Sequence, residues 1–430
     1  MFSKKTINDY DIAGMRVLLR TDYNVPQNSD GSVASTYRIE QSLPTIKALQ
    51  EKGCQIVICS HLGRPKSYTD IQFSLKPVAR ELSKLLKQSV VFVSDCVGDS
   101  VKQATGSMQA GDIVMLENVR FHEEEEKNDP DFAKNIIDCT GVQILVQDGF
   151  GVVHRAHTTT SAIALQIPAV AGLLLEREVD TITNVMQNPK RPLMAIIGGA
   201  KISDKIDIIH KFIDTADIVA IGGAMANTFL KAQGLEIGDS LSDDEELDTA
   251  HDIMNKVRHT AKSRDFVFYL PQDGVVSTEI DKKTTTRIVG WDINVVADIE
   301  AYPSRPRLET SHVKKHEKIL DIGPVSGAFI AGAVQMVDTV VWNGTMGVSE
   351  VKAVHGPIGP FAHGTEIIMD ALVGKYGHRP YSLVGGGDTA GYVEARGMND
   401  MFNHVSTGGG ASLELMAGRD LPGVSVLWDK

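Results

Sequence analysis

Short apolar runs rich in valine and isoleucine recur along the whole chain, and longer stretches with helical periodicity separate them. The runs in the first half are Val17–Leu19, Ile56–Cys59, Val90–Val93, Ile113–Leu116 and Ile144–Val146. Those in the second half are Leu193–Ile197, Ile218–Ile221, Phe266–Leu270, Ile319–Ile322, Val340–Trp342 and Ser382–Val384. Strands that alternate with helices are typical of α/β proteins. The sequence therefore predicts an α/β fold with mostly parallel sheets.

The composition excludes several classes of protein. Of the 430 residues, 42% are hydrophobic and 23% are charged, which is typical of a globular protein and not of a disordered, fibrous or disulfide-stapled chain. The length allows two or three domains. The 55 acidic residues outnumber the 43 basic ones and give a net charge of −12, which argues against non-specific binding to nucleic acid. An anionic substrate therefore requires a local cluster of positive charge.

The sequence also bears on the cellular compartment. No C-x-x-C pair occurs among the four cysteines, which suits a reducing environment. Residues Met1–Asp11 mix lysines with aspartates and lack the apolar core of a signal peptide. The longest uncharged stretch, Thr158–Leu175, contains Pro168 and predicts a buried loop and helix start rather than a membrane span. We therefore expect a cytoplasmic protein whose partners include neither a membrane nor a nucleic acid.

The residues that follow the predicted strands differ between the two halves of the chain. Ligands of open parallel sheets bind outside the carboxyl ends of the strands, so these residues are the first candidates for a site. In the first half they are polar or cationic: Arg20–Asn24, Ser60–Arg64, Glu117–Arg120 and Asp148–Arg155. In the second half they are rich in glycine: Gly198–Lys201, Gly222–Ala224, Asn343–Gly344 and Gly385–Thr389. Two α/β domains with different ligands are therefore predicted.

A single helix is predicted between the two halves. Leu173–Gln187 has helical spacing and stops before Asn188 and Pro189, because a residue that precedes proline disfavours the helical conformation. We expect this helix to join an N-terminal domain of residues 1–172 to a second domain that begins at residue 188.

Four arginines at or near the predicted strand ends indicate an anion pocket: Arg38, Arg64, Arg120 and Arg155. A planar guanidinium donates two parallel hydrogen bonds to a phosphate or a carboxylate. The alternative is that each arginine forms a surface ion pair of little energetic value. His61, His154 and His157 raise the alternative of a metal site, but no further ligand stands at a suitable spacing. A supporting or anion-contacting role is the favoured interpretation of these histidines.

Glycine turns between a strand and a helix let backbone amides approach a phosphate at the positive end of the helix. The turn from Gly385 to Ala390 fits a loose G-x-G-x-x-A pattern, so a nicotinamide-dependent dehydrogenase is an alternative function. The chain contains neither a P-loop nor the signature motifs of protein kinases, so nucleotide binding requires another architecture. Asp388 in this turn is either a helix cap or an oxygen ligand of a magnesium ion carried on nucleotide phosphates.

Lys201 and Lys205 are spaced by one helical turn, which predicts two ammonium groups on the same helix face. In a phosphate site such lysines neutralise a phosphoryl group in transit. The alternative is a solvated helix face on which Asp204 and Asp207 balance the lysines.

Two acidic runs, Glu123–Glu126 and Asp243–Glu246, are interpreted as solvated surface or helix starts without a function. Three methionines, Met225, Met346 and Met416, are interpreted as core residues.

Nine long strings stand in a fixed order along the chain: RTDYNVP from Arg20, SHLGRP from Ser60, ENVRFHEEEEKND from Glu117, HRAHTTT from His154, GGAKISDKI from Gly198, GGAMANTFLK from Gly222, WNGTMGVSE from Trp342, GGGDTA from Gly385 and HVSTGGGASLELMAG from His404. At these strings the chain resembles the phosphoglycerate kinase family, and the match runs nearly end to end. The resemblance implies two Rossmann-like, three-layer α/β/α domains joined by a helix and a hinge. It implies a nucleotide domain over residues 188–405 and a last segment, residues 406–430, that returns to the first domain.

The resemblance also implies a reaction and its partners. The reaction is reversible phosphoryl transfer from 1,3-bisphosphoglycerate to MgADP, giving 3-phosphoglycerate and MgATP, by in-line transfer after hinge closure. The implied cofactor is Mg²⁺, bound as MgATP or MgADP, and the implied oligomeric state is a monomer.

Roles are implied residue by residue. The glycerate substrate is contacted by Asp22, Tyr23, Asn24, Arg38, His61, Leu62, Gly63, Arg64, Arg120 and Arg155. The nucleotide is contacted by Lys201, Lys205, Gly223, Asn343, Glu350, Gly386, Gly387, Asp388 and Thr389, with Asp388 on the magnesium ion and Glu350 near the ribose. The moving phosphoryl group is surrounded by Arg38, Lys201, Lys205 and the amides of Gly386, Gly387, Gly408 and Gly409.

Four positions depart from the usual family strings: Gly149 for alanine or cysteine, Thr345 for proline, Ser349 for phenylalanine and Gly391 for a small residue other than glycine. Thr345 and Ser349 border the expected nucleotide pocket, so they bear on nucleotide affinity more than on activity.

The stretch Trp291–Glu317, which carries Arg305 and Arg307, is longer than the family pattern. An added surface loop is the simplest interpretation, and an interaction site is an alternative. A scaffold that binds nucleotide or phosphate without turnover is an alternative for the whole chain, although the intact Arg38 and Lys201 argue against it.

Overall fold

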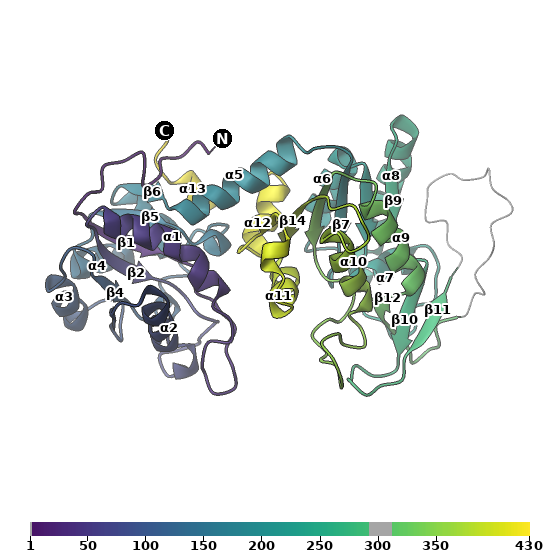
Figure 1. The fold of residues 1–430 in the computed structure, drawn as a ribbon, viewed down its shortest axis with the longest axis horizontal. Helices are drawn as coiled ribbons and strands as arrows, with labels where there is room; N and C mark the ends of the chain where they lie inside the picture. Colours follow the sequence, from purple (N-terminus) through teal and green to yellow (C-terminus); the bar gives the residue numbers. More distant parts are fainter. Residues whose placement is uncertain (1, 292–311) are drawn as a thin grey trace. The chain divides into compact units, whose positions relative to one another are not determined.

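The computed structural model describes residues 2–291 and 312–430, and the chain divides into two compact units. Unit 1 contains residues 1–183 and 410–430, and unit 2 contains residues 184–409 (Figure 1). Arg305 and Arg307 of the predicted insertion lie outside the described residues.

Unit 1 is built around a sheet of six parallel strands in the order β3-β4-β2-β1-β5-β6. In chain order the strands are β1 (Arg16–Arg20), β2 (Gln55–Cys59), β3 (Val90–Phe92), β4 (Ile113–Met115), β5 (Ile144–Gln147) and β6 (Ala169–Ala171). The apolar runs predicted in this half of the chain are all strands of this sheet. β6 is absent from the prediction, because it has only 3 residues and follows Pro168 within the stretch interpreted as a loop.

Helices pack on this sheet and complete its core. They are α1 (Tyr37–Glu51), α2 (Lys76–Leu86), α3 (Asp99–Gly106) and α4 (Pro130–Thr140), with short turns η1 (Ile71–Phe73), η2 (Val119–Phe121), η3 (Phe150–Val152), η4 (Thr158–Ala162) and η5 (Ile163–Leu165). Val17 and Leu19 of β1 pack with Ile46 of α1 and Leu82 of α2. Leu18 points to the opposite face of the sheet and is equally buried. Burial on both faces explains why these strands appear as continuous apolar runs.

Helix α5 (Leu173–Gln187) has the bounds predicted from the sequence. It begins in unit 1, directly after β6, and its last turn belongs to unit 2, which starts at Asn184.

The last segment of the chain belongs to unit 1, through α12 (Gly410–Met416) and α13 (Pro422–Ser425). The amide of Lys5 donates to the carbonyl oxygen of Trp428 at 2.7 Å, and the Trp428 amide donates to the carbonyl oxygen of Ala169 at 3.1 Å. Segments from the two ends of the chain therefore lie together beside β6 (Figure 1).

Unit 2 contains a second sheet of six parallel strands, in the order β15-β14-β13-β7-β8-β9. The strands are β7 (Leu193–Ile197), β8 (Ile218–Ile221), β9 (Val267–Tyr269), β13 (Thr339–Asn343), β14 (Tyr381–Gly385) and β15 (His404–Val405). The helices are α6 (Ile206–Thr215), α7 (Gly223–Ala232), α8 (Leu247–Ser263), α9 (Pro324–Val334), α10 (His363–Leu372) and α11 (Gly387–Ala395), with turns η6 (Asp244–Glu246) and η7 (Asn399–Met401). Over the described ranges, no helix is long and apolar enough to cross a membrane.

A separate antiparallel sheet in unit 2 has the order β11-β10-β12. Its strands are β10 (Asp273–Ser277), β11 (Arg287–Gly290) and β12 (Lys318–Ile322). The predicted run Ile319–Ile322 is therefore a strand, but it lies outside the parallel sheet because it pairs with β10.

Candidate functional site

Side chains that follow four neighbouring strands of unit 1 meet at one edge of its sheet. β4, β2, β1 and β5 are adjacent, and they lead into Arg120, His61, Asp22 and the loop over residues 148–155. Parallel strands share a carboxyl edge, so this topology gathers residues from distant parts of the sequence. We call this surface the arginine cradle; it consists of Asp22, Arg38, His61, Arg64, Arg120 and Arg155.

An ion pair lies within the arginine cradle. Arg38, in the first turn of α1, donates to Asp22 Oδ2, and His61 Nδ1 lies 3.9 Å from Asp22 Oδ1. Burial alone would raise the pKa of Asp22, but the charge of Arg38, together with the hydrogen bond from the Asn24 amide, outweighs it and lowers the pKa. Burial holds the pKa of His61 well below its ordinary value and outweighs the opposing charge of Asp22. Asp22 is therefore an anion and His61 is neutral at pH 7.

Asn24 and Arg120 both hold the backbone of Gly63. The Gly63 amide donates to Asn24 Oδ1 at 2.8 Å, and Arg120 Nη1 donates to the Gly63 carbonyl oxygen at 2.8 Å. Gly63 has a φ of +60°, and a Cβ there would lie 2.3 Å from the Phe73 ring. Only glycine fits this position, which brings three of the predicted substrate residues together.

The arginines of the cradle differ in their partners. Arg120 Nε lies 3.2 Å from Glu126 Oε1, but the Arg120 side chain is only 8% exposed, so this is not the exposed surface pair of the alternative. Arg64 and Arg155 are exposed, and within the described residues neither side chain has a hydrogen-bond or ion-pair partner. These two guanidinium groups are therefore available to an anionic ligand.

Two of the predicted substrate residues point into the core. Tyr23 is fully buried, and its hydroxyl lies 2.7 Å from Ser42 Oγ. Leu62 is buried as well, and its carbonyl oxygen accepts a hydrogen bond from Asn118 Nδ2 at 2.7 Å. These side chains therefore support the cradle from below.

A buried charged pair lies in unit 1 that the sequence does not reveal. Arg20 and Glu125 are 1% and 0% exposed, and Arg20 Nη2 lies 3.9 Å from Glu125 Oε1. Thr159 donates to Glu125 through its amide at 3.0 Å and its hydroxyl at 2.6 Å. The prediction of solvated surface for Glu123–Glu126 is therefore wrong at Glu125, because its partners come from distant segments of the chain.

Replacement of Glu125 with alanine is expected to lower the free energy of unfolding by about 3 kcal/mol. The reason is that Arg20 would keep a buried charge without a counter-ion and Thr159 would lose its acceptor. Urea unfolding measures this loss. Glu123→Ala is the control, because Glu123 pairs with Lys127 at the surface; equal losses in the two variants would contradict the role assigned to Glu125.

In unit 2, neighbouring strands lead into glycine-rich loops that approach one another closely. β14, β13, β7 and β8 are adjacent. A Cβ at Gly223 would lie 2.6 Å from the Gly199 amide nitrogen, and one at Gly198 would lie 2.1 Å from the Thr345 carbonyl oxygen. Glycine is required at such contacts, and the result is an edge lined by backbone groups. We call residues 198–201, 222–224, 343–345 and 385–389 the glycine edge.

The predicted helix face shared by Lys201 and Lys205 is wrong. α6 begins at Ile206, and the residues before it form a loop and a turn. The i,i+4 spacing therefore does not place the two ammonium groups side by side. Lys201 is exposed, and its side chain has no partner in the part of the chain that the structure describes.

Lys205 turns inward and holds two loops of the glycine edge. Its Nζ donates to Asn343 Oδ1 at 2.7 Å and to the Gly198 carbonyl oxygen at 2.5 Å. Burial lowers the pKa of Lys205 to about 8, against the opposing charges of Asp388 and Asp204. Lys205 is therefore mostly protonated at pH 7 and supports the site, whereas Lys201 is free to reach a ligand.

The N-terminus of α11 offers unused donors. Gly386 precedes the helix with a φ of +90°, and a Cβ there would lie 3.2 Å from the side-chain amide of Asn343. Asn343 Nδ2 is buried and has no hydrogen-bond partner among the described residues. A free amide donor beside the positive end of a helix is what a phosphate group requires.

The remaining residues of this turn have separate roles. Thr389 is buried, and its Oγ1 accepts a hydrogen bond from the Gly344 amide at 2.6 Å, so it holds two loops together. A Cβ at Gly409 would lie 3.6 Å from the Gly387 amide nitrogen. The segment that contains the predicted Gly408 and Gly409 therefore lies against the start of α11. The Gly408 amide donates to Ser406 Oγ at 3.2 Å.

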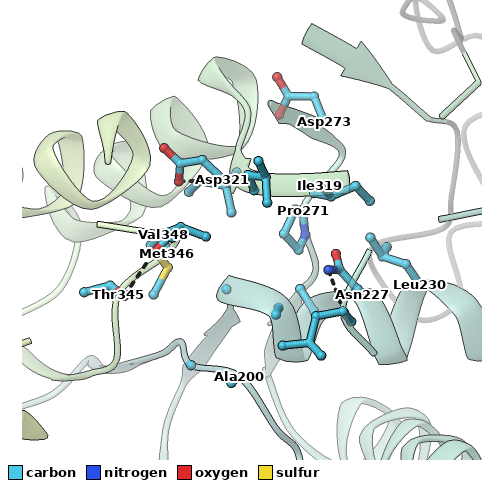
Figure 2. A pocket seen from close by; sticks show the side chains of 18 of the residues that line it. Ala200, Asn227, Leu230, Pro271, Asp273, Ile319, Asp321, Thr345, Met346 and Val348 are labelled. Atoms are coloured by element: carbon cyan, nitrogen blue, oxygen red, sulfur yellow. Dashed lines mark hydrogen bonds between the residues drawn. The ribbon is translucent and has the colours of Figure 1, made fainter. Parts of the chain in front are cut away.

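A cavity of about 200 Å³ adjoins the glycine edge. Figure 2 shows Leu230, Ile319 and Val348 among the side chains around it, and Ala200 and Thr345 at its margin. Glu350 and Asp388 also line it. Thr345 Oγ1 donates to the Gly347 carbonyl oxygen at 3.1 Å, so this departure from the family strings adds no free hydroxyl. A mostly apolar cavity with a few polar groups is typical of a small-molecule site.

Asp321 lies in the wall of this cavity (Figure 2) and is 2% exposed. Its Oδ2 accepts from the Gly364 amide and its Oδ1 from the Ile322 amide, each at 2.9 Å. Burial raises the pKa of Asp321 to about 8 despite these hydrogen bonds. The carboxyl group is therefore mostly protonated at pH 7.

The raised pKa of Asp321 predicts that the folded chain becomes less stable as the pH rises. The pKa of Asp321 is about 8 in the folded chain, whereas the ordinary value for an aspartate is 3.8, so the folded state binds more protons between these values. The free energy of unfolding should fall by up to about 1.4 kcal/mol per pH unit across this window. Asp321→Asn removes this contribution, so melting temperatures measured from pH 5 to pH 8 should fall less in the variant than in the wild type. Parallel curves would refute the assignment.

The structure offers groups suited to metal binding in two places. Asp388 is exposed and has no side-chain partner among the described residues, so its hard oxygens fit a magnesium ion. Asp95, Cys96 and His122 bring ligand atoms within 4.8 Å of one another. However, Asp95 Oδ1 lies 2.9 Å from His122 Nε2, and the Cys96 thiol donates to the Glu117 carbonyl oxygen. Each of the three groups already has a hydrogen-bond partner, and we assign no metal to them.

Comparison with known proteins gives the family. The sequence profile described as Phosphoglycerate kinase matches residues 7–419. A phosphoglycerate kinase from Dictyoglomus turgidum (strain DSM 6724 / Z-1310) is 42% identical over 431 residues, which cover 100% of both chains. The chain belongs to the phosphoglycerate kinase family. A phosphoglycerate kinase from Pelotomaculum thermopropionicum (strain DSM 13744 / JCM 10971 / SI) is also 42% identical, over 428 residues and 100% of both chains.

Solved phosphoglycerate kinases share the fold. The enzyme from Coxiella burnetii has a TM-score of 0.76 and 33% identity, covering 98% of each chain. The enzyme from Pyrococcus horikoshii OT3 has a TM-score of 0.80 and 26% identity, covering 99% of this chain and 98% of that one. The predicted family and the predicted two-domain α/β class are therefore confirmed. The dehydrogenase alternative for the Gly385–Ala390 turn is wrong, because the family is one of kinases.

Of the departures from the phosphoglycerate kinase strings, Gly149 has a local structural reason. A Cβ at Gly149 would lie 2.9 Å from the Thr21 carbonyl carbon, so glycine relieves a close contact with the strand end that carries Asp22. Ser349 and Gly391 line one groove together with Glu350. A Cβ at Gly391 would meet nothing within 4 Å, so glycine is not required there.

Proposed function

We propose that this chain catalyses the reversible transfer of a phosphoryl group from 1,3-bisphosphoglycerate to MgADP, which yields 3-phosphoglycerate and MgATP in glycolysis and gluconeogenesis. The arginine cradle supports this proposal most. The chain has a net charge of −12, yet the arginine cradle brings Arg38, Arg64 and Arg155 to one edge of the sheet. Among the described residues, the side chains of Arg64 and Arg155 are unpaired. A substrate that carries both a phosphate and a carboxyl group needs such donors.

In the proposed complex, unit 1 binds the glycerate. Arg64, Arg120, Arg155 and the neutral His61 hold the phosphate, since guanidinium forks match its oxygens. Asp22 accepts a hydrogen bond from the substrate hydroxyl, and Asn24 contacts the carboxyl end. Arg38 gives up part of its hydrogen bonding to Asp22 and donates to the reacting phosphoryl group instead.

Unit 2 binds the nucleotide. The cavity beside the glycine edge takes the base, and Glu350 at its margin hydrogen-bonds the ribose. The phosphates lie against Gly223, the Gly386 and Gly387 amides and the free Asn343 donor. Thr389 and Lys205 keep these loops in place.

Charge stabilisation and positioning carry the chemical step. The moving phosphoryl group gathers negative charge on its oxygens, and Arg38, Lys201 and the amides of Gly408 and Gly409 offset it. Lys205, with its lowered pKa, adds a positive charge behind the loops. Asp388 holds Mg²⁺, which neutralises charge on the nucleotide phosphates.

The two substrates bind to different units, so the proposal includes hinge closure that brings them in line and excludes water. Small-angle scattering tests this step, because the radius of gyration should fall when both substrates are present. An unchanged radius would rule out closure.

We further propose that the enzyme is a cytoplasmic monomer.

The test of the function is a coupled assay. NADH oxidation is followed with glyceraldehyde-3-phosphate dehydrogenase as coupling enzyme, in the presence of 3-phosphoglycerate and MgATP. Turnover that requires both substrates supports the proposal. A folded chain that binds MgADP without turnover would overturn it in favour of a binding scaffold.

A further inference from the structure

Asp148 follows β5 and caps a helix that starts far along the chain. Its Oδ1 accepts hydrogen bonds from the Leu174 amide at 2.9 Å and the Leu175 amide at 3.2 Å, which lie in the first turn of α5. The side chain is almost fully buried, with 1% exposure for the residue. The same residue opens the loop that leads to Arg155 in the arginine cradle. Asp148 therefore joins a substrate loop to the first turn of the helix that leaves unit 1.

Helix α1 is tied to the same turn. Thr45 Oγ1 accepts a hydrogen bond from the Leu173 amide at 3.1 Å, next to the two amides that Asp148 accepts from. Gln41 Oε1 accepts from Arg177 Nη2 at 2.6 Å. Positions 38, 41 and 45 recur at helical spacing, so α1 presents Arg38 to the cradle and its next turns to α5.

The packing around Asp148 leaves no room for movement. A Cβ at Gly172 would lie 2.2 Å from Asp148 Oδ1, so the chain passes directly against the carboxyl group. The Asp148 amide donates to the Arg20 carbonyl oxygen at 2.9 Å, which fixes the residue to β1 beside Asp22. A shift of this side chain therefore has to move α5, α1 or the cradle loop with it.

We propose that Asp148 is a positioning residue that sets Arg38 and Arg155 in register with each other and with the first turn of α5. This inference rests on the proposed function, because its effect is read in the turnover of 3-phosphoglycerate. Asp148 touches no substrate in this scheme and acts through the elements that carry the arginines. Loss of its oxygen atoms should misplace both arginines by a fraction of an ångström to about 1 Å, which is enough to cost roughly tenfold to a hundredfold in rate.

The chemistry at Asp148 allows a discriminating pair of variants. Burial raises the pKa of Asp148 to about 7, so its surroundings accept a neutral side chain. Asp148→Asn keeps an oxygen acceptor for the Leu174 and Leu175 amides, whereas Asp148→Ala removes it. The positioning role thus needs the oxygen and not the charge.

The experiment compares these variants by steady-state kinetics and by binding of MgADP. Asp148→Ala should lower kcat roughly tenfold or more and raise the KM for 3-phosphoglycerate, with an unchanged Kd for MgADP because unit 2 binds the nucleotide. Asp148→Asn should restore both parameters to within about twofold of the wild type. Thr45→Val removes only the hydroxyl that accepts from the Leu173 amide. It should change kcat and the KM in the same direction as Asp148→Ala, and it provides the test if Asp148→Ala does not fold.

A matched control separates positioning from stability alone. Asp129 caps α4 in the same way, with Oδ1 accepting from the Asp131 and Phe132 amides at 2.8 Å each. Asp129→Ala should lower the melting temperature and leave kcat and KM nearly unchanged. Equal kinetics for Asp148→Ala and Asp129→Ala, or no rescue by Asp148→Asn, would overturn the inference while the wild type is active. An inactive wild type would instead overturn the proposed function, and the inference with it.

Discussion

Arg38→Ala is expected to reduce turnover by about 1000-fold. Arg38 is the cradle arginine that pairs with Asp22 and is proposed to meet the moving phosphoryl group. Its loss removes a bidentate positive charge from the transition state, which a water molecule cannot replace. The coupled assay with 3-phosphoglycerate and MgATP measures the change. The melting temperature should fall as well, because the buried Asp22 loses its main counter-charge while His61 is neutral, so the assay is made below that temperature.

Two further variants test the interpretation of Arg38. Arg38→Lys retains the charge but not the planar fork, so it should recover only part of the lost activity. Arg80→Ala removes an exposed arginine of α2 in the same unit and should leave turnover unchanged. Wild-type activity in Arg38→Ala would remove the arginine from the chemical step.

Lys201→Ala is expected to lower kcat by about 100-fold or more, without a change in melting temperature. Lys201 is exposed and lacks a side-chain partner in the described ranges, so the folded chain loses no contact with it. Its proposed partner is the phosphoryl group in transit. The same coupled assay and a thermal melt give both values.

Lys205 and Lys282 are the comparisons for Lys201. Lys205→Ala should lower both activity and melting temperature, because its ammonium group bridges Asn343 and the Gly198 carbonyl oxygen. Lys282→Ala removes an exposed lysine elsewhere in unit 2 and should change neither. A melting temperature that fell as far in Lys201→Ala as in Lys205→Ala would contradict the distinction between a free and a supporting lysine.

The strands of the parallel sheets are predictable from the sequence because burial on both faces makes them continuous apolar runs. Ile319–Ile322 has the same appearance, yet it joins an antiparallel sheet, since strand pairing depends on β10 and not on local composition. The short β6 is hidden for a different reason. Its 3 residues carry too little pattern to separate it from the surrounding loop.

The candidate site is predictable where it follows strand ends and unpredictable where it depends on distant partners. Topology alone gathers Asp22, His61 and Arg120 at one edge. The burial of Glu125 depends on Arg20, which is far away in the sequence, and Lys201 and Lys205 lie in a loop and a turn before α6 begins at Ile206. Periodicity carries no signal for either feature.

The return of residues 410–430 to unit 1 has a consequence for the order in which the chain folds during synthesis. Unit 2 is continuous over residues 184–409, so all of its described strands are synthesised before α12 and α13. Unit 1 starts first, but the backbone contacts of Trp428 with Lys5 and Ala169 form only after residue 428 is synthesised. The domain that is begun first is therefore completed last.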